Sequence, residues 1–403
     1  MDHCRRFLYY SILVSILAIL SNCATSQILR GHVIDKSTNV PLASASIFIN
    51  GTSIGTVTGI AGEFKLSGIP RGKFDLIASY AEYQTRIITI IATHDSVLTI
   101  YLQPRTVVTE NVIVRNYVEN GWDRWGALFT KTFLGNSSFA EECKIQNTGD
   151  IRFSYSEKED MLWVVAQKPI IIINKALGYK VEYDLEQFAY NLGSNRLVFG
   201  GYTFFTELKG NKNQLRRWEK NRVDCYEGSV RHFMRALATH RSAQEGFLIR
   251  SLKIIPDTEK ERIKLIMKNV PSRDIHPDSL KYYKDMLKDR NTNTIADRSP
   301  LNENTIVHDG IDSESVLLTF PDYLLITYPR KEEPSDYLQR NMLVRLDTCV
   351  TGILNLENDE VLTVYKTGNY YNPVNLIISG YWAWREKAAT LLPQNYYLPV
   401  KQE

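Results

Sequence analysis

Ser229 and His232 are the two side chains whose types and spacing best suit nucleophilic catalysis. They stand three residues apart in a segment that predicts a helix, so one helix face would present both. A serine nucleophile is usually held in a strained turn such as Gly-x-Ser-x-Gly, and Gly228-Ser229 has only half of that pattern. The spacing therefore admits a hydrolase centred on this pair, with a structural serine and histidine as the alternative.

Aromatic side chains gather near the end of the sequence, where Tyr381, Trp382 and Trp384 stand together. The chain has 23 Tyr and only 15 Phe, and tyrosine combines an apolar ring with a polar hydroxyl. Such a cluster can stack on sugar rings, or it can form cross-strand contacts within a sheet. The first interpretation makes these three residues a binding site and predicts an exposed, coplanar ring pair.

Metal and cofactor chemistry are not indicated by the cysteines. Besides Cys4 and Cys23, the chain has Cys143, Cys225 and Cys349, which are far apart and lack any Cys-x-x-Cys or histidine at zinc spacing. At most one disulfide can form among the last three, and the sequence does not choose the pair. Buried thiols are the alternative. We predict no metal site and no cofactor.

The most charged segment that we expect to be ordered is 214–239, which predicts a helix. Its basic residues alternate with aromatic ones and are Arg216, Arg217, Lys220, Arg222, Arg231 and Arg235. This face could contact phosphate, lipid headgroups or an acidic partner, or it could be a solvated helix face. The whole chain has 48 basic and 45 acidic residues, a net charge of +3, which argues against a nucleic-acid partner.

The N-terminus has the pattern of an export signal. Arg5 and Arg6 precede an apolar run that ends at Leu20, about 14 residues long and short for a membrane span of about 20. A cut after Ser26 would release a soluble exported chain. Alternatively, the residues up to Cys23 resemble a bacterial lipobox, which would make Cys23 a lipidation site; an uncleaved anchor is the third interpretation. We expect the periplasm, outer membrane or cell surface as location, with membrane association only through that lipid anchor.

The region from 28 to 102 has the alternation and the glycine turns of about seven short strands. Seven strands in about 75 residues bury their apolar faces by pairing two sheets. Asn50-Gly51 predicts a two-residue hairpin turn within this series.

Several motifs in this region resemble the carboxypeptidase regulatory-like domain. They are Gly31-His32-Val33-Ile34-Asp35, Pro41-Leu42-Ala43-Ser44-Ala45-Ser46-Ile47, Gly55-Thr56-Val57-Thr58, Gly62-Glu63-Phe64, Gly72-Lys73-Phe74 and Tyr83. The resemblance implies a transthyretin-like, seven-stranded sandwich of the kind found at the N-terminus of exported and outer-membrane proteins of Bacteroidota-type bacteria. It implies no peptidase activity, and the chain has no His-Glu-x-x-His or His-x-x-Glu spacing.

The remainder predicts a larger, β-rich α+β domain. Trp122, Trp125, Phe129 and Phe133 fall on one face of a short helix that ends at Gly135, and a β-meander follows. The predicted organisation is a signal peptide at 1–26, the sandwich at 27–104, an α+β region at 105–255, a polar insertion at 256–312, and strands with the Tyr/Trp-rich C-terminus at 313–403.

Export signal, sandwich and missing catalytic spacing together favour a non-enzymatic envelope protein with a binding or scaffold role. In this hypothesis the sandwich is a docking or spacer module, and the partner is another envelope protein or a glycan. Two alternatives stay open. One is an exported hydrolase whose site is assembled from distant segments, and the other is a surface glycan-binding protein.

Overall fold

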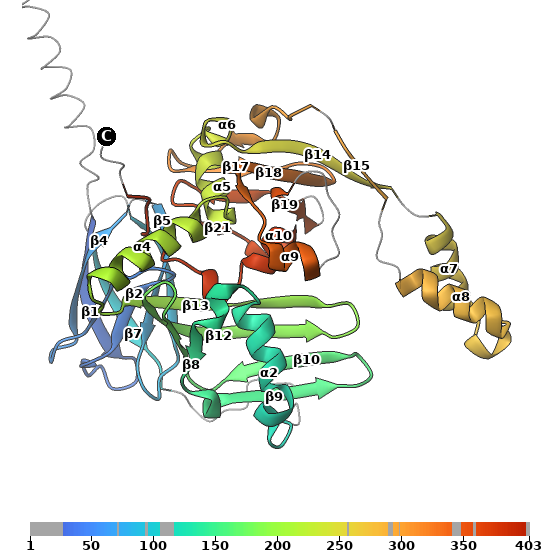
Figure 1. Cartoon of the computed structure of the whole chain (residues 1–403). Helices are drawn as coiled ribbons and strands as arrows, with labels where there is room; N and C mark the ends of the chain where they lie inside the picture. The colour runs from blue at the N-terminus through green and yellow to red at the C-terminus, as the bar shows by residue number, and fades with distance from the viewer. Residues whose placement is uncertain are drawn as a thin grey trace, which may run out of the picture.

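The computed structural model describes residues 27–70, 72–92, 96–104, 117–255, 258–288, 293–297, 299–340, 348–357 and 360–399. The predicted signal segment and Cys23 lie outside these residues. Figure 1 shows the N-terminal strands as a block beside a larger body, with a pair of helices standing away from it. In the described part of the chain, no helix has the length and apolar character needed to cross a membrane.

The N-terminal region is a β-sandwich, as predicted. Its strands are β1 (Gln27–Asp35), β2 (Ser46–Ile49), β3 (Gly55–Val57), β4 (Glu63–Ile69), β5 (Gly72–Ser79), β6 (Arg86–Ala92) and β7 (Ser96–Leu102). One sheet has the order β4-β1-β7 and the other β3-β2-β5-β6. Alternate side chains such as Val33, Ile47 and Phe74 are buried between the sheets, because successive strand residues face opposite sides.

The Asn50-Gly51 turn differs from the predicted two-residue hairpin. Strands β2 and β3 pair up to Phe48 and Gly55, so a longer loop joins them. The loop is longer because its backbone bonds outside the sandwich: Gly51 N–H donates to Thr203 O at 2.7 Å. The sandwich is thereby attached to the body.

The first part of the body is an antiparallel sheet covered by a helix. Its strands are β8 (Cys143–Ile145), β9 (Ile151–Ser156), β10 (Met161–Ala166), β11 (Ile170–Asn174), β12 (Tyr179–Asn191) and β13 (Arg196–Glu207), beside the short elements α3 (Ser138–Glu141) and η1 (Thr148–Asp150). The order is β8-β11-β12-β10-β9, and β13 pairs with the other edge of β12. Helix α2 (Gly121–Leu134) buries Phe129 and Phe133 against this sheet. The predicted aromatic helix face is thus the face that packs in the core.

Two helices replace the single helix expected over 214–239. They are α4 (Lys212–Tyr226) and α5 (Val230–Ala238), and α6 (Ser242–Glu245) follows. The break occurs at Gly228, whose φ of +70° ends the first helix, and Ser229 caps the second with its side chain. Helix α4 lies on the surface, whereas α5 is buried along most of its length.

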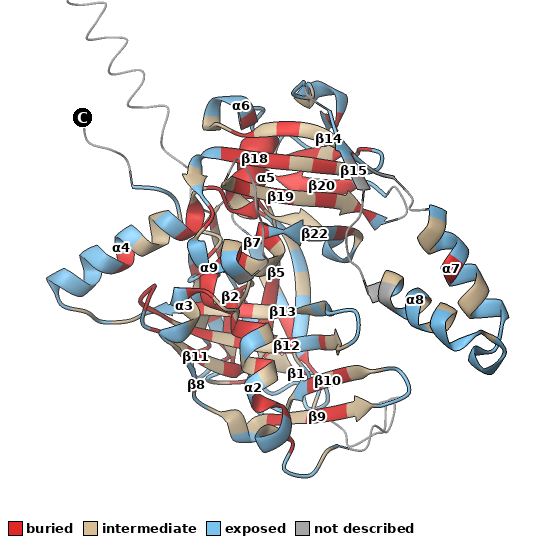
Figure 2. Ribbon diagram, turned by 45° about the vertical axis from the view of Figure 1, so that its right-hand side comes forward, coloured by how far each residue is buried: buried red, intermediate tan, exposed pale blue. Residues whose placement is uncertain are grey.

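The second part of the body consists of two sheets around α5. The strands are β14 (Leu248–Ile255), β15 (Asn293–Ala296), β16 (Val307–Asp309), β17 (Ser315–Leu318), β18 (Tyr323–Glu332), β19 (Cys349–Leu356), β20 (Leu362–Tyr365), β21 (Tyr370–Tyr371) and β22 (Leu376–Gly380). The short helices here are η3 (Glu303–Thr305), α9 (Ser335–Arg340) and η5 (Pro373–Asn375). The sheet orders are β15-β14-β18-β19-β22 and β16-β17-β20-β21. Phe233 and Leu237 of α5 pack with Ile326 and Leu362 in one core, which Figure 2 shows as buried ribbon.

A helical arm projects from the β14–β15 ribbon. It comprises α7 (Thr258–Asn269), η2 (Ser272–Asp274) and α8 (Pro277–Lys288), where the sequence predicted one short helix around 280–288. Helix α7 is short of apolar residues, which hid it from periodicity, and its only wholly buried side chain among those described is Ile263.

The C-terminal segment returns across the molecule to the sandwich. After α10 (Tyr381–Arg385) and η6 (Ala388–Thr390), Gln394 N–H donates to Gly51 O at 2.6 Å. Asn395 Oδ1 then accepts from the Ser53 backbone at 3.1 Å. The last described residues therefore fix the sandwich against the body.

Candidate functional site

The Ser229 and His232 side chains do not form a nucleophile and base pair. Ser229 Oγ accepts from the backbone N–H of His232 at 3.1 Å, which is the cap of α5. His232 Nδ1 accepts from the Gly228 N–H at 3.2 Å, and Nε2 lies 3.6 Å from Glu245 Oε2. Neither ring nitrogen is available to remove a proton from the serine.

The environment of His232 is that of a buried structural residue. Its ring is 4% exposed and packs against Tyr226, Phe247 and Tyr328. Burial lowers its pKa, although the carboxylate of Glu245 opposes the shift. The hydrolase hypothesis therefore has no support at this pair.

The Tyr381, Trp382 and Trp384 cluster is interior, so the predicted exposed ring pair is wrong. Trp382 is 0% exposed, and its Nε1 donates to Gly228 O at 2.8 Å. Tyr381 and Trp384 stack at 5.7 Å between ring centroids, but Tyr381 is only 3% exposed. A sugar needs an accessible ring face. The rings of this cluster instead pack α10 against β19 and β22, so they offer no such face.

Cys143 of β8 and Cys225 of α4 are free thiols; Cys225 is buried in the core of the first body sheet, and the half-buried Cys143 packs against it. Burial raises the pKa of each to about 12, which keeps both protonated and unreactive at neutral pH. Cys349 Sγ lies 3.8 Å from Pro329 O. Among the described residues no cluster of three or more His, Cys, Asp or Glu could hold a metal.

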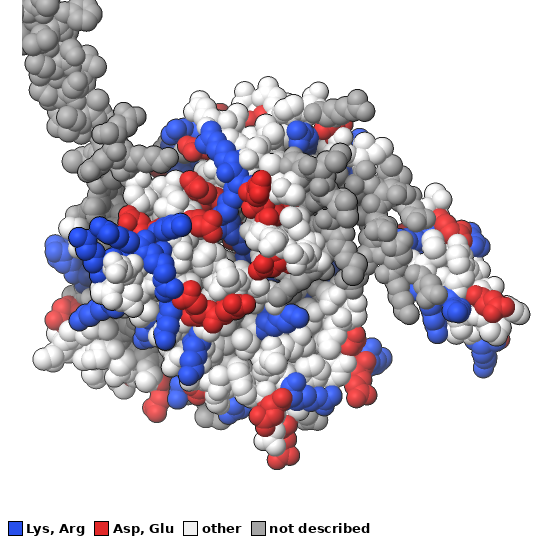
Figure 3. All heavy atoms as spheres, in the orientation of Figure 1, with Lys and Arg blue, Asp and Glu red and all other residues white. Residues whose placement is uncertain are grey.

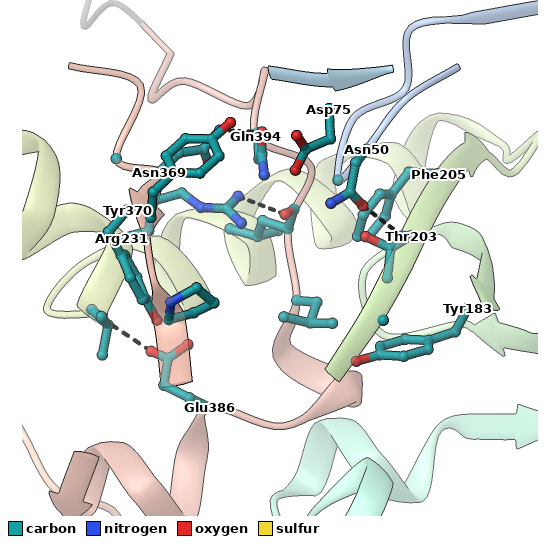
Figure 4. Close-up of a pocket in the computed structure, with 18 residues that line it drawn as sticks. Asn50, Asp75, Tyr183, Thr203, Phe205, Arg231, Asn369, Tyr370, Glu386 and Gln394 are labelled. Carbon is teal, nitrogen blue, oxygen red and sulfur yellow. Dashed lines mark hydrogen bonds between the residues drawn. The ribbon is translucent and has the colours of Figure 1, made fainter. Parts of the chain in front are cut away.

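A cavity of about 370 Å³ lies where the sandwich, the first body sheet, α5 and the C-terminal segment meet (Figure 4). We call it the junction cavity. Its lining residues are Asn50, Gly51, Asp75, Tyr183, Gly201, Thr203, Phe205, Val230, Arg231, Gly368, Asn369, Tyr370, Tyr371, Pro373, Glu386, Leu391, Leu392 and Gln394. The size is in the range of small-molecule sites.

The sandwich forms one wall of the junction cavity through the loop after β2. Asn50 Oδ1 accepts from Thr203 N–H at 2.9 Å, and Phe205 N–H donates to Thr52 O at 3.0 Å. Gly51 has φ +72°, and a Cβ there would meet Gln394 Nε2 at 2.5 Å. This wall needs glycine because both the backbone conformation and the close approach exclude a side chain.

Arg231 and Glu386 form the charged part of the cavity. Arg231 Nη1 donates to Leu392 O at 2.5 Å, and Glu386 Oε1 accepts from Val230 N–H at 3.2 Å at the start of α5. Burial and the adjacent guanidinium of Arg235 lower the pKa of Arg231 to about 10, so it remains a cation at neutral pH. A guanidinium has five N–H donors, and Leu392 O occupies one of them.

Several polar groups of the cavity keep hydrogen-bonding capacity. Tyr183 points its hydroxyl into the cavity (Figure 4), and neither that hydroxyl nor the Tyr370 hydroxyl has a hydrogen-bond partner in the part of the chain described. Burial raises the pKa of both phenols, that of Tyr370 to about 12. Among the described residues, Asp75 accepts one side-chain hydrogen bond, from the Thr89 hydroxyl to Oδ1. Donors and acceptors are thus both available.

The remaining cavity wall is supplied by the loop and strand at 368–371. Asn369 Nδ2 donates to Gln394 Oε1 at 2.6 Å, which fixes the two amides together. The Tyr371 ring is held by the Lys73 ammonium of the sandwich, 4.1 Å from the ring centroid. These contacts orient an aromatic ring and an amide pair at the cavity.

Sequence reasoning missed this site. It noted Arg231 as one cation of a basic segment and Asn50-Gly51 as a turn, but Asp75, Glu386 and Gln394 carried no local signal. Their convergence depends on tertiary contacts between residues separated by as many as 342 positions, as in the Ser53 and Asn395 pair.

Residues 29–114 match the family model of the CarboxypepD_reg-like domain, which confirms the resemblance predicted for the N-terminal region. No curated protein sequence matches the chain.

Solved structures match parts of the chain. A type II cohesin–X-dockerin complex from Acetivibrio cellulolyticus is 25% identical over 19% of this chain and 56% of that chain, with a TM-score of 0.18. The minor pilin GBS52 of Streptococcus agalactiae is 16% identical over 21% of this chain and 46% of that one, with a TM-score of 0.17. A putative carbohydrate binding protein from Bacteroides uniformis is 10% identical over 45% of this chain and 99% of that one, with a TM-score of 0.17. Scores this low assign no function to the chain.

Proposed function

We propose that this protein is an exported, non-enzymatic binding protein of the cell envelope whose junction cavity holds a small, neutral, polyhydroxylated ligand of the saccharide class. The observation that supports this proposal is that hydrogen-bond donors and acceptors with remaining capacity surround one cavity. Arg231 supplies donors, Asp75 and Glu386 supply acceptors, and Tyr183 and Tyr370 supply hydroxyls that do both.

The charges of the cavity favour a neutral ligand. An anion near Arg231 would also face the carboxylates of Asp75 and Glu386, and a cation near those carboxylates would face Arg231. Sugar hydroxyls donate to carboxylates and accept from guanidinium, so they satisfy both kinds of group. The Tyr371 ring beside them offers an apolar face for a sugar ring.

A binding role fits the cavity better than a catalytic one. No serine or histidine of the described chain lines it, and its hydroxyl groups are those of tyrosine and of Thr203. The sandwich, expected as a docking or spacer module, acts in this proposal as a wall of the site.

The test is calorimetric titration of the protein with a panel of neutral mono- and disaccharides, beside acidic and amino sugars of matched size. Neutral sugars should bind, and charged analogues should bind more weakly. Tyr370→Phe, which removes one hydroxyl, should weaken binding about 5- to 10-fold, as expected for about 1 kcal/mol per hydrogen bond. Tyr101→Phe is the matched control, because Tyr101 is exposed on β7, away from the cavity.

Two results would overturn the proposal. If the wild type, Tyr370→Phe and Asp75→Asn bind a neutral sugar with equal affinity, the sugar does not bind in the junction cavity. Consumption of the sugar, followed by chromatography and abolished in Asp75→Asn or Glu386→Gln, would make the protein an enzyme.

The envelope location is tested separately by mass spectrometry of the N-terminus of the protein purified from its own cells. A start at Gln27 indicates cleavage after Ser26, and an acylated Cys23 indicates a lipid anchor. An intact N-terminus in the cytoplasmic fraction would contradict export.

A further inference from the structure

Helix α4 has one face anchored to the body and an opposite face on which cations outnumber the single carboxylate, Glu219. The anchored face includes Trp218, whose Nε1 donates to Lys175 O at 2.8 Å, and Asn221, whose Nδ2 donates to Ala176 O at 2.8 Å. Arg222 also belongs to it, with its guanidinium 4.0 Å from the Tyr179 ring centroid. These contacts leave the helix little freedom to rotate about its axis.

The cations of the opposite face are Lys212, Arg216 and Lys220, which we call the α4 stripe. Residues spaced by four positions advance about 40° per step at 3.6 residues per turn, so these three align along about 12 Å of the helix. Their mean direction is about 180° from that of the anchored residues, and all three are exposed, as is the carboxylate of Glu219 at the edge of the same face.

The cations of the α4 stripe differ from the other two cations of the helix in their pairing with carboxylates. Arg217 pairs with Glu142 at 3.0 Å, and Arg222 pairs with Glu207 at 2.9 Å. Within the described chain, no ion pair joins a stripe residue to a carboxylate. Figure 3 shows the resulting basic region over α4, the most continuous one on that face of the molecule.

The α4 stripe lies apart from the junction cavity, because no residue of α4 lines that cavity. Leu215 lies beside the stripe and is 50% exposed, so an apolar side chain is available at the same level as the cations. Long basic side chains can contact lipid headgroups while a neighbouring leucine reaches the headgroup boundary.

We propose that the α4 stripe docks this protein on the surface of an anionic lipid bilayer. Three unpaired cations meet the negative headgroups, and Leu215 enters the headgroup boundary while the anchored face holds the helix parallel to the membrane. The complementarity is of charge, and it needs no pocket. This contact is separate from the junction cavity and from any lipid anchor.

The test is sedimentation with vesicles of phosphatidylglycerol and phosphatidylcholine, using the chain from Gln27 onward, which lacks Cys23. Wild type should bind vesicles rich in phosphatidylglycerol, release them as salt rises, and ignore pure phosphatidylcholine. Lys212→Glu/Arg216→Glu/Lys220→Glu should lose at least about 100-fold in partitioning, from about 1 kcal/mol per cation.

The matched control is Lys268→Glu/Lys281→Glu/Lys284→Glu on the exposed arm, with the same change in net charge. It should bind like wild type, and Lys212→Arg/Lys220→Arg should also retain binding. The proposal is overturned if both triple variants lose binding equally, because net charge alone would then explain the attraction. It is also overturned if wild type ignores anionic vesicles, or if the stripe instead retains an acidic protein from the same envelope with vesicles left unbound.

Discussion

His232 connects the break between α4 and α5 to the core. Its Nδ1 accepts from Gly228 N–H, the residue whose positive φ ends α4, and its Nε2 faces Glu245 beyond α5. Because Nδ1 accepts a hydrogen bond, the neutral ring has its proton on Nε2. A second proton on Nδ1 would break the bond to the backbone.

The stability of the protein should therefore fall as pH falls below about 6.5. The folded pKa of His232 is lowered by burial, so the unfolded chain binds a proton there that the folded chain does not. The contribution is full above the unfolded pKa of about 6.5 and declines, by at most about 1.4 kcal/mol per pH unit, down to the folded pKa. Urea unfolding of wild type and His232→Gln between pH 7.5 and 5 measures this slope.

The variant should be less stable at pH 7.5 but less sensitive to acid. Parallel stability curves for the two proteins would assign the acid sensitivity to other groups. Glu303, whose pKa is raised by burial, acts in the opposite direction, because its contribution is present at low pH and declines as pH rises.

A candidate site made of sequence neighbours can be proposed from the sequence, whereas a cavity lined by distant segments cannot. The spacing of Ser229 and His232 suggested a catalytic pair. In the structure Ser229 is the N-cap of α5, which explains the same spacing by helix capping. By contrast, Asp75 and Glu386 are single carboxylates in unrelated segments, and only the folded chain places both at one cavity.

At the scale of elements, Arg235 of α5 determines the path of the C-terminal segment. Its guanidinium donates to the carbonyls of Thr367, Gln394 and Tyr396 at 2.5 to 2.8 Å. Arg235 is 7% exposed; its bond to Thr367 O is buried, and its bonds to Gln394 O and Tyr396 O are partly buried. Helix α5 and the C-terminal segment are thereby joined by one residue.

Arg235→Ala should cost at least about 3 kcal/mol of unfolding free energy, because three carbonyls lose a charged donor. Hydrogen exchange should rise first in 391–399, the segment that the guanidinium holds. Arg216→Ala, on the exposed side of α4, is the control and should change stability by less than about 0.5 kcal/mol. A loss of similar size in both variants would show that the three carbonyl bonds contribute little.

Elements with strong periodicity followed the sequence, and the departures have local causes. The seven strands of the sandwich and the aromatic face of α2 were predictable from alternation and from 3.6-residue spacing. The break between α4 and α5 was missed because a single glycine, Gly228, interrupts an otherwise continuous helical pattern. The arm helix α7 was missed because its sequence is mostly charged.

At the scale of the whole molecule, backbone hydrogen bonds join the sandwich to the body. Gly51 donates to Thr203 and accepts from Gln394, and Phe205 donates to Thr52. Phe48 of the sandwich also packs on Phe204 of β13 at 5.2 Å between ring centroids. We expect a single calorimetric unfolding transition for the wild type.

Gly51→Ala should divide that transition into two. An alanine at φ +72° costs about 1 to 2 kcal/mol, and its Cβ would displace the Gln394 amide. The interface would weaken while both cores stay intact. Gly149→Ala is the matched control, since a Cβ there meets nothing within 4 Å. If Gly51→Ala still unfolds in one step at the wild-type temperature, the loop does not couple the two parts.

The contact between Gly51 and Gln394 also fixes when during biosynthesis the junction cavity can exist. The sandwich leaves the ribosome first and, in the proposed export, crosses the membrane first, and domains generally fold as units with the N-terminal one ahead. Residue 394 is added more than 340 residues after the loop that it closes, so the loop backbone stays bonded to water until then. A chain that is still emerging can therefore hold a folded sandwich but not the junction cavity, which is complete only when residue 394 has joined it.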